Sequence, residues 1–146
     1  MDYTQEELIE AINSATQTIN GRTEACTEYT RGTNDCAALL VAYDKALRGS
    51  SSKAELDFQW RNPRDFVVKL GRQGFTVASY LEHCGYEIVT NNRPKIGDVA
   101  FAGGAMIASP RGWISTSEDN EGVVRFKQLM FLEMNINTIA RPKRID

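Results

Sequence analysis

Apolar residues in the first half of the chain recur at the spacing of helices. Thr4 and Glu7 form a capping box, and an apolar stripe then follows one helical face as far as Gly21. This stripe contains Leu8, Ile9, Ile12, Ala15 and Ile19. The polar stretch at residues 22–32 lacks such a stripe and predicts an irregular loop. We therefore expect a first helix that covers the core, followed by a connection.

A second helix is predicted to begin at Cys36. The side chains of residues 33–35 can cap free backbone N–H groups, and Asp35 is the last of them. The apolar stripe that follows ends at Gly49 and consists of Cys36, Leu39, Leu40, Tyr43 and Leu47. The same spacing predicts two shorter helices, at residues 63–71 and 76–84.

From residue 86 the apolar period changes to that of β-strands. Short apolar runs alternate with turn-forming Gly, Pro, Asn and Asp residues. The runs predict strands at residues 86–89, 99–102, 105–109, 113–117, 123–126 and 136–140, with a helical turn at 129–132. Short strands joined by tight turns form an antiparallel meander. The expected fold class is therefore α+β, with N-terminal helices packed on a C-terminal antiparallel sheet.

The length and composition fit one globular domain. The chain has 146 residues, of which 42% are hydrophobic and 25% are charged, and this is enough apolar material for a core. We expect a single domain over residues 1–146, with a helical half at about 4–85, a sheet half at about 86–140 and a short basic tail at 141–146. The tail contains Arg141, Lys143 and Arg144, which we expect to be solvated.

Charge and hydropathy give no indication of nucleic-acid binding, a membrane span or a secretory signal. A net charge of −2 gives no reason to expect nucleic acid. No apolar run is long enough to span a membrane, and residues 1–7 are acidic where a secretory signal would be basic and then apolar. We therefore expect no membrane span and synthesis in a reducing cytoplasm.

The chain has three cysteines, Cys26, Cys36 and Cys84, and a single histidine, His83. An odd number of cysteines without metal-ligand spacing predicts neither a disulfide framework nor a zinc site. The two glycines at residues 103–104 indicate a hairpin turn rather than a phosphate-binding loop. We expect no metal and no cofactor.

Cys36 has two interpretations. At a helix N-terminus, the positive end of the helix dipole lowers the pKa of a thiol and favours the nucleophilic thiolate. On an apolar stripe, however, a free cysteine is commonly a packing residue. The pattern is compatible with both.

Two segments resemble a known family. Asn34-Asp35-Cys36-Ala37 opens a predicted helix, and Gly97-Asp98-Val99-Ala100-Phe101 begins the predicted sheet. Together with Gly85 and the strand at residues 113–115, they resemble the NlpC-type branch of the papain-like cysteine peptidase superfamily, in particular its small phage-associated members. The resemblance covers roughly residues 5–140 in layout and implies a papain-like fold.

In that family, the cysteine attacks a peptide carbonyl, a histidine after the Gly-Asp motif removes its proton, and a polar residue orients the histidine. The resemblance implies Cys36 as the nucleophile and Asp35 as the helix cap. The strand where the histidine is expected, residues 104–108, contains none, and none follows it. His83 is the remaining candidate base, although it lies near a predicted helix end, where a histidine commonly has a structural role.

The resemblance implies two alternative functions. The missing histidine favours a catalytically inactive NlpC-like module, a structural or binding component of the tail or neck of a phage particle. Such a module is made in the host cytoplasm and joins other phage structural proteins in a multi-copy virion assembly, with Phe58 and Trp60 as candidate contact residues. The alternative is a cysteine peptidase or amidase that acts on peptidoglycan stem peptides, with Cys36 as nucleophile and His83 or a partner's residue as base.

Overall fold

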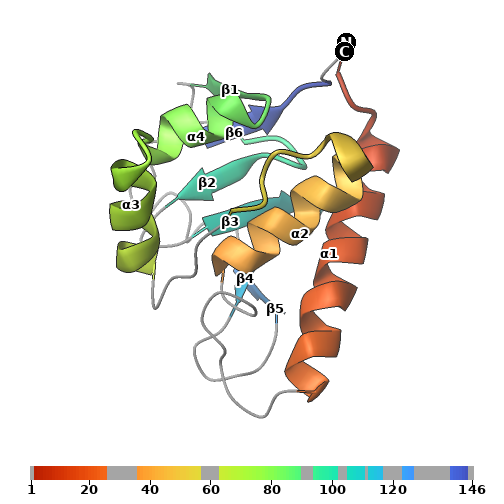
Figure 1. The fold of residues 1–146 in the computed structure, drawn as a ribbon. Helices are drawn as coiled ribbons and strands as arrows, with labels where there is room; N and C mark the ends of the chain where they lie inside the picture. The colour runs from red at the N-terminus through yellow and green to blue at the C-terminus, as the bar shows by residue number, and fades with distance from the viewer. Residues whose placement is uncertain are drawn as a thin grey trace.

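The computed structural model describes residues 2–25, 36–56, 63–89, 94–101, 105–110, 112–116, 123–126 and 139–144. Within this part of the chain, four α-helices and one 3₁₀ helix come before the six β-strands in the sequence (Figure 1). The helices are α1 (Gln5–Ala25), α2 (Cys36–Arg48), η1 (Gly49–Ser51), α3 (Pro63–Arg72) and α4 (Val77–His83). The strands are β1 (Tyr86–Val89), β2 (Val99–Phe101), β3 (Ala105–Ser109), β4 (Gly112–Thr116), β5 (Val123–Phe126) and β6 (Ile139–Pro142). The predicted α+β class, with helices before an antiparallel sheet, is confirmed.

The strands form one sheet in the order β1-β6-β2-β3-β4-β5. Successive strands pair antiparallel from β2 to β5, as in a meander. The predicted meander is wrong at the other end, because β6 lies between β1 and β2 and pairs with both. Ile88 of β1 and Val99 of β2 face Ala140 from its two sides. Apolar alternation predicts that a strand exists and which of its faces is buried, but it does not predict which strand it pairs with.

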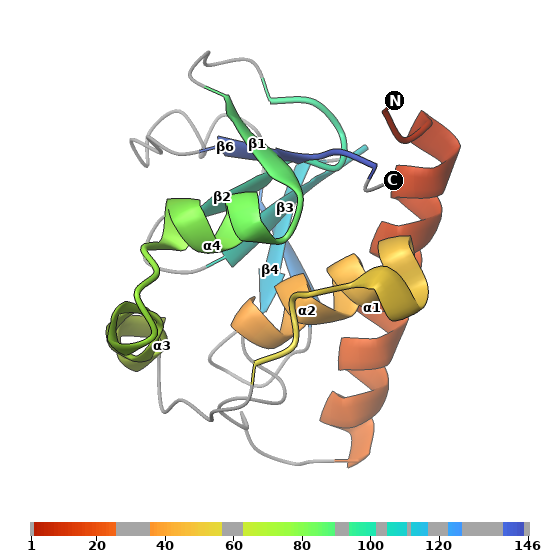
Figure 2. The ribbon, with the colours of Figure 1, turned by 45° about the horizontal axis from the view of Figure 1, so that its top comes forward.

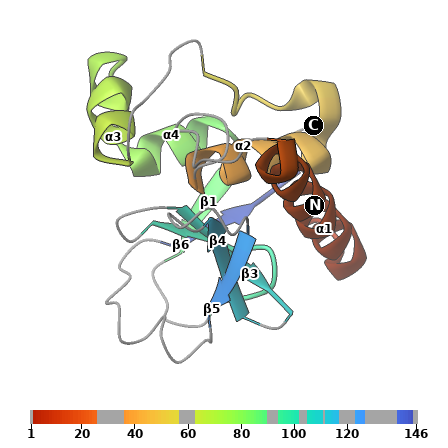
Figure 3. The same cartoon turned by 90° about the horizontal axis from the view of Figure 1, so that it is seen from below.

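The helices cover one face of the sheet (Figure 3). α1 and α2 lie side by side, as Figure 2 shows, and their apolar stripes face the sheet. The core on this face joins Ile12 and Leu39 of the helices to Val99 and Ile107 of the strands. The apolar stripes that predict the first two helices therefore form the main core.

The opposite face of the sheet carries a second apolar cluster. Successive strand residues point to opposite faces, so Val99 belongs to the helix-side core and Ala100 to the second cluster. The second cluster consists of Ala100, Met106, Ala108, Trp113 and Ile139. Trp113 is only 1% exposed, so this face of the sheet is also buried.

The first helix is longer than predicted. α1 continues through Gly21 to Ala25, so the first four residues of the predicted loop are helical. Arg22, Glu24 and Ala25 favour a helix, and an interior glycine costs only about 1 kcal/mol. Neither α1 nor any other helix in the described part of the chain has the length and hydropathy needed to cross a membrane.

The predicted basic tail is in part a strand of the sheet, whereas Arg144 is exposed, as predicted. The closing strand extends to Pro142 and includes Arg141. Lys143 Nζ lies 3.0 Å from the Asp2 carboxylate and 3.3 Å from that of Glu87. Arg144 pairs with Glu7. These cations are ordered because each meets an acidic group that is distant in the sequence.

The turn before β2 holds the sheet against α1 and α2. Gly97 has a φ of +92°, and the Tyr43 hydroxyl donates a 2.7 Å hydrogen bond to its carbonyl oxygen. A Cβ at residue 97 would lie 2.8 Å from Leu8 Cδ2 and 3.0 Å from the Tyr43 hydroxyl. Both the backbone conformation and the close approach of the two helices therefore require glycine here.

Replacing Gly97 with alanine should destabilise the fold more than the same change at Gly74. Both residues have positive φ, +92° and +87°, but a Cβ at residue 74 would meet no atom within 4 Å. We expect Gly74→Ala to lower the free energy of unfolding by about 1–2 kcal/mol through backbone strain, and Gly97→Ala by about 2–5 kcal/mol because crowding adds to the strain. Urea denaturation measures both. Equal losses would show that Leu8 and Tyr43 move aside without cost.

Candidate functional site

Cys36 is the first residue of α2, and the residues directly before it lie outside the described part of the chain. The structure describes the backbone of this residue but not its thiol. Asp35 and the candidate contact residues Phe58 and Trp60 lie outside the described residues. The part of the predicted site that the structure establishes here is the position of Cys36 along α2.

His83 is the last residue of α4, where its imidazole is exposed and packs against Phe75 with the ring centroids 5.3 Å apart. The Gly85 carbonyl oxygen, two residues later, accepts a 3.2 Å hydrogen bond from Arg48 Nη2. Cys36 and Arg48 are the two ends of α2, which at 1.5 Å per residue lie about 18 Å apart. The segment that follows His83 thus contacts the side chain of the last residue of α2, whereas Cys36 is the first residue of that helix.

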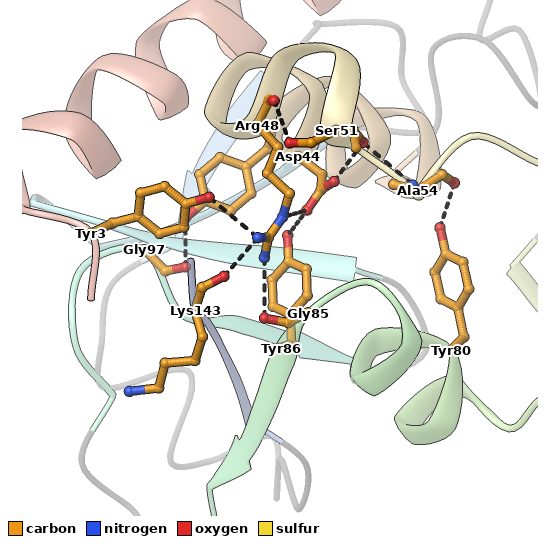
Figure 4. A network of polar contacts seen from close by, with 12 residues as sticks. Tyr3, Asp44, Arg48, Ser51, Ala54, Tyr80, Gly85, Tyr86, Gly97 and Lys143 are labelled. Atoms are coloured by element: carbon orange, nitrogen blue, oxygen red, sulfur yellow. Dashed lines mark hydrogen bonds and ion pairs between the residues drawn. The ribbon is translucent and has the colours of Figure 1, made fainter. Parts of the chain in front are cut away.

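The C-terminal half of α2 contains a buried ion pair that the apolar pattern did not reveal. Arg48 Nε lies 2.9 Å from Asp44 Oδ1, and neither side chain is exposed. The Tyr86 hydroxyl donates a 2.8 Å hydrogen bond to Asp44 Oδ1, and the Ser52 hydroxyl donates one of 2.5 Å to Oδ2 (Figure 4). These donors offset the cost of burying the carboxylate. The i,i+4 spacing of Asp44 and Arg48 is the signal in the sequence that could have indicated this pair.

Arg48 also joins three segments that are distant in the sequence. Its Nη1 donates to the Lys143 carbonyl oxygen at 2.6 Å and to the Tyr3 hydroxyl at 3.2 Å, and its Nη2 donates to the Gly85 carbonyl oxygen. Burial opposes the charge of the guanidinium, but the hydrogen bond and the negative charge of Asp44 outweigh it and raise the pKa of Arg48. The partners of Arg48 thus belong to the protein itself, and the network has an architectural role.

Asp98, which belongs to the Gly-Asp segment of the resemblance, is also held by the protein. Its side chain is buried, and Arg141 Nε and Nη2 donate to its two oxygens at 2.9 and 3.0 Å. The backbone N–H of Lys95 donates a further hydrogen bond of 2.8 Å. This bidentate pair ties β6 to the start of β2. The acidic residue of the motif therefore stabilises the sheet.

Cys84 is a free thiol in the core, directly after α4. It has no exposed surface. Burial, followed by the negative charge of Asp44, raises the pKa of the Cys84 thiol to about 11. A thiol with this pKa is protonated at neutral pH and is a weak nucleophile. Cys84 is therefore a packing residue.

Comparison with known proteins adds no functional assignment. No family model matches the chain, and searches for similar curated proteins and similar solved structures return no match. The functional interpretation therefore depends on the placement of Cys36 and His83 and on the motifs of the sequence.

Removing Arg48 should destabilise the protein strongly, because it leaves the Asp44 carboxylate buried without its counter-ion. We expect Arg48→Met to lower the free energy of unfolding by about 3–5 kcal/mol. The matched control is Lys45→Met in the same helix, where Lys45 and Glu55 form a 3.1 Å pair with side chains 46% and 73% exposed. This change should cost less than about 1 kcal/mol. Chemical denaturation measures both, and an equally small loss for Arg48→Met would contradict the role given to the pair.

Cys84 should react slowly with thiol reagents in the folded protein. At pH 8 a thiol with a pKa of about 11 is roughly 0.1% thiolate, and burial also limits access. Mass spectrometry after a pulse of iodoacetamide should find Cys84 unmodified under native conditions and modified in urea. Rapid modification under native conditions would mean that the end of α4 opens readily.

Proposed function

We propose that this protein is a catalytically inactive NlpC-like module with a structural or binding role in a phage particle. The observation that carries the proposal is the position of the chain's single histidine. His83 ends α4, and two residues later Gly85 contacts the side chain of Arg48 at the C-terminal end of α2, whereas Cys36 is the first residue of α2. A cysteine peptidase needs a base within hydrogen-bond reach of its thiol, and this chain has no second histidine to supply an imidazole there.

The lack of a base has a large kinetic effect. A positioned general base contributes about 10²–10⁴ in rate, and a histidine also supplies the cation that stabilises a thiolate. Asp98 is no substitute, because Arg141 holds both of its oxygens. A thiol at residue 36 without an imidazole is better explained by packing than by nucleophilic attack.

Three features support the papain-like part of the proposal. A helix begins at Cys36, an antiparallel sheet follows the helices, and the Gly97-Asp98 segment directly precedes β2. These elements occur in the order that the resemblance implies. The phage setting comes from the resemblance to small phage-associated members of the superfamily. In that setting the chain is made in the host cytoplasm and joins other structural proteins of the tail or neck in multiple copies.

The alternative function is that of a cysteine peptidase or amidase acting on peptidoglycan stem peptides. One observation favours it, because Cys36 occupies the N-terminus of a 13-residue helix, where the helix dipole stabilises a thiolate. In this alternative His83 or a residue of a partner chain supplies the base.

The proposal is tested by incubating the purified chain with murein sacculi and with isolated stem peptides. We expect no released fragments above the buffer background, and the same result for Cys36→Ala, because no imidazole activates the thiol. Chromatography and mass spectrometry of the soluble products measure the release. Fragments that appear with the wild-type chain and disappear with Cys36→Ala would favour the peptidase instead.

The particle role needs a separate measurement. Quantitative mass spectrometry of purified particles of the phage that encodes the chain should detect it in multiple copies per particle. Its absence from intact particles would contradict a virion role even if the chain were catalytically silent.

A further inference from the structure

A cleft of about 460 Å³ lies between the start of the chain, the turn before β2 and the end of β6. Leu8, Ile96 and Pro142 form its apolar wall, and Asp2, Lys95 and Arg141 are its charged groups. Its volume is within the range of about 300–1,000 Å³ that is typical of small-molecule sites. The described residues that line it include none from α2, so the cleft is separate from the region around Cys36.

The walls of this cleft are held in place by contacts within the protein. Arg141 is fixed by its two hydrogen bonds to Asp98. The segment at the start of the chain is fixed by the 3.0 Å ion pair of Asp2 with Lys143 and by the hydrogen bond that Tyr3 accepts from Arg48. A preformed site loses little conformational entropy when a ligand binds.

The cleft also has cationic hydrogen-bond donors that the described residues leave available. Lys95 is exposed, and its Nζ forms no ion pair with any residue that the structure describes. Asp98 uses Nε and Nη2 of Arg141, and Nη1 has no hydrogen-bond partner within the described part of the chain. Asp2 is already paired with Lys143, whose hydrogen bond and charge lower the pKa of the Asp2 carboxyl. An ammonium and one edge of a guanidinium therefore remain for a ligand.

We infer that this cleft binds a small carboxylate that carries an aliphatic group. The carboxylate binds Lys95 Nζ and Arg141 Nη1 through charge-assisted hydrogen bonds, which both cations form with carboxylates. The aliphatic group packs against the apolar wall, which offers no partner to a second charge. This chemistry is found in a free branched-chain acid and in the last residue of a peptide that ends in an aliphatic side chain.

The test uses the full chain labelled with ¹⁵N and three probes: N-acetyl-leucine, N-acetyl-leucinamide and inorganic phosphate. N-acetyl-leucine should shift amide signals of Lys95, Ile96 and Arg141, with a dissociation constant of about 1 mM. The amide lacks the charge and phosphate lacks the aliphatic group, so each should bind about tenfold more weakly.

Two lysine variants provide the matched comparison. Lys95→Gln should weaken the binding of N-acetyl-leucine about fivefold to tenfold, because it removes a charge-assisted hydrogen bond. Lys53→Gln makes the same change at an exposed lysine outside the cleft and should leave binding unchanged. Both side chains are exposed, and the spectra of the free variants verify that each remains folded.

The outcomes separate the parts of the inference. Equal binding of N-acetyl-leucine and its amide would overturn the carboxylate site, equal binding of phosphate would overturn the aliphatic site, and no shifts at about 20 mM would overturn both. A peptide that ends in leucine distinguishes the two sources of the ligand: tighter binding than N-acetyl-leucine supports a polypeptide C-terminus, and equal binding supports a small acid. These measurements do not involve Cys36, so their result is independent of the murein assay.

Discussion

Two opposite charges are enclosed in the C-terminal half of α2, where the side chains of Asp44 and Arg48 have no exposed surface. Burying such a pair costs desolvation energy, which only well-formed additional hydrogen bonds offset. Asp44 has Tyr86 as a further donor, and Arg48 has the carbonyl oxygens of Gly85 and Lys143 as acceptors. Displacing any of these segments would leave a polar group in the interior without a partner. The pair therefore determines which parts of the chain meet at the C-terminal half of α2.

The ion pair between Asp98 and Arg141 likewise fixes two distant segments relative to each other, at the pairing of β6 with β2. It ties β6 to the start of β2, while Gly97 allows α1 and α2 to approach the same turn. In an inactive module the Gly-Asp segment still has a physical reason to be present, because both of its residues position the helices and the closing strand. The contacts of Gly97 and Asp98 therefore account for this segment without a catalytic role.

Local patterns predicted the elements of this fold better than they predicted its pairings. The helix start at Cys36 and the strands at residues 86–89, 105–109 and 123–126 follow from capping residues and apolar periodicity, which are properties of neighbouring residues. The insertion of β6 between β1 and β2 depends on contacts about 40–55 residues apart along the chain, which a periodic pattern does not contain.

The same distinction applies to the candidate site. The sequence predicted that Cys36 lies in one helix and His83 near the end of another, and the structure has Cys36 in α2 and His83 as the last residue of α4. Their relative position could not be predicted, because it depends on tertiary contacts such as the hydrogen bond between Arg48 and Gly85. Asp44 was missed because an acidic residue next to an apolar stripe usually faces solvent, and its burial depends on Arg48 and on Tyr86, 42 residues away.

The position of β6 has a consequence for folding during synthesis. Among the described strands β1 pairs only with β6, so a nascent chain that has exposed β1 must wait for about 50 further residues before that strand acquires its neighbour. At ribosomal rates of about 5–20 residues per second, this delay lasts several seconds. During that interval the backbone N–H and C=O groups of β1 are available to other chains. A chaperone would therefore protect the protein most in the period before β6 pairs with β1.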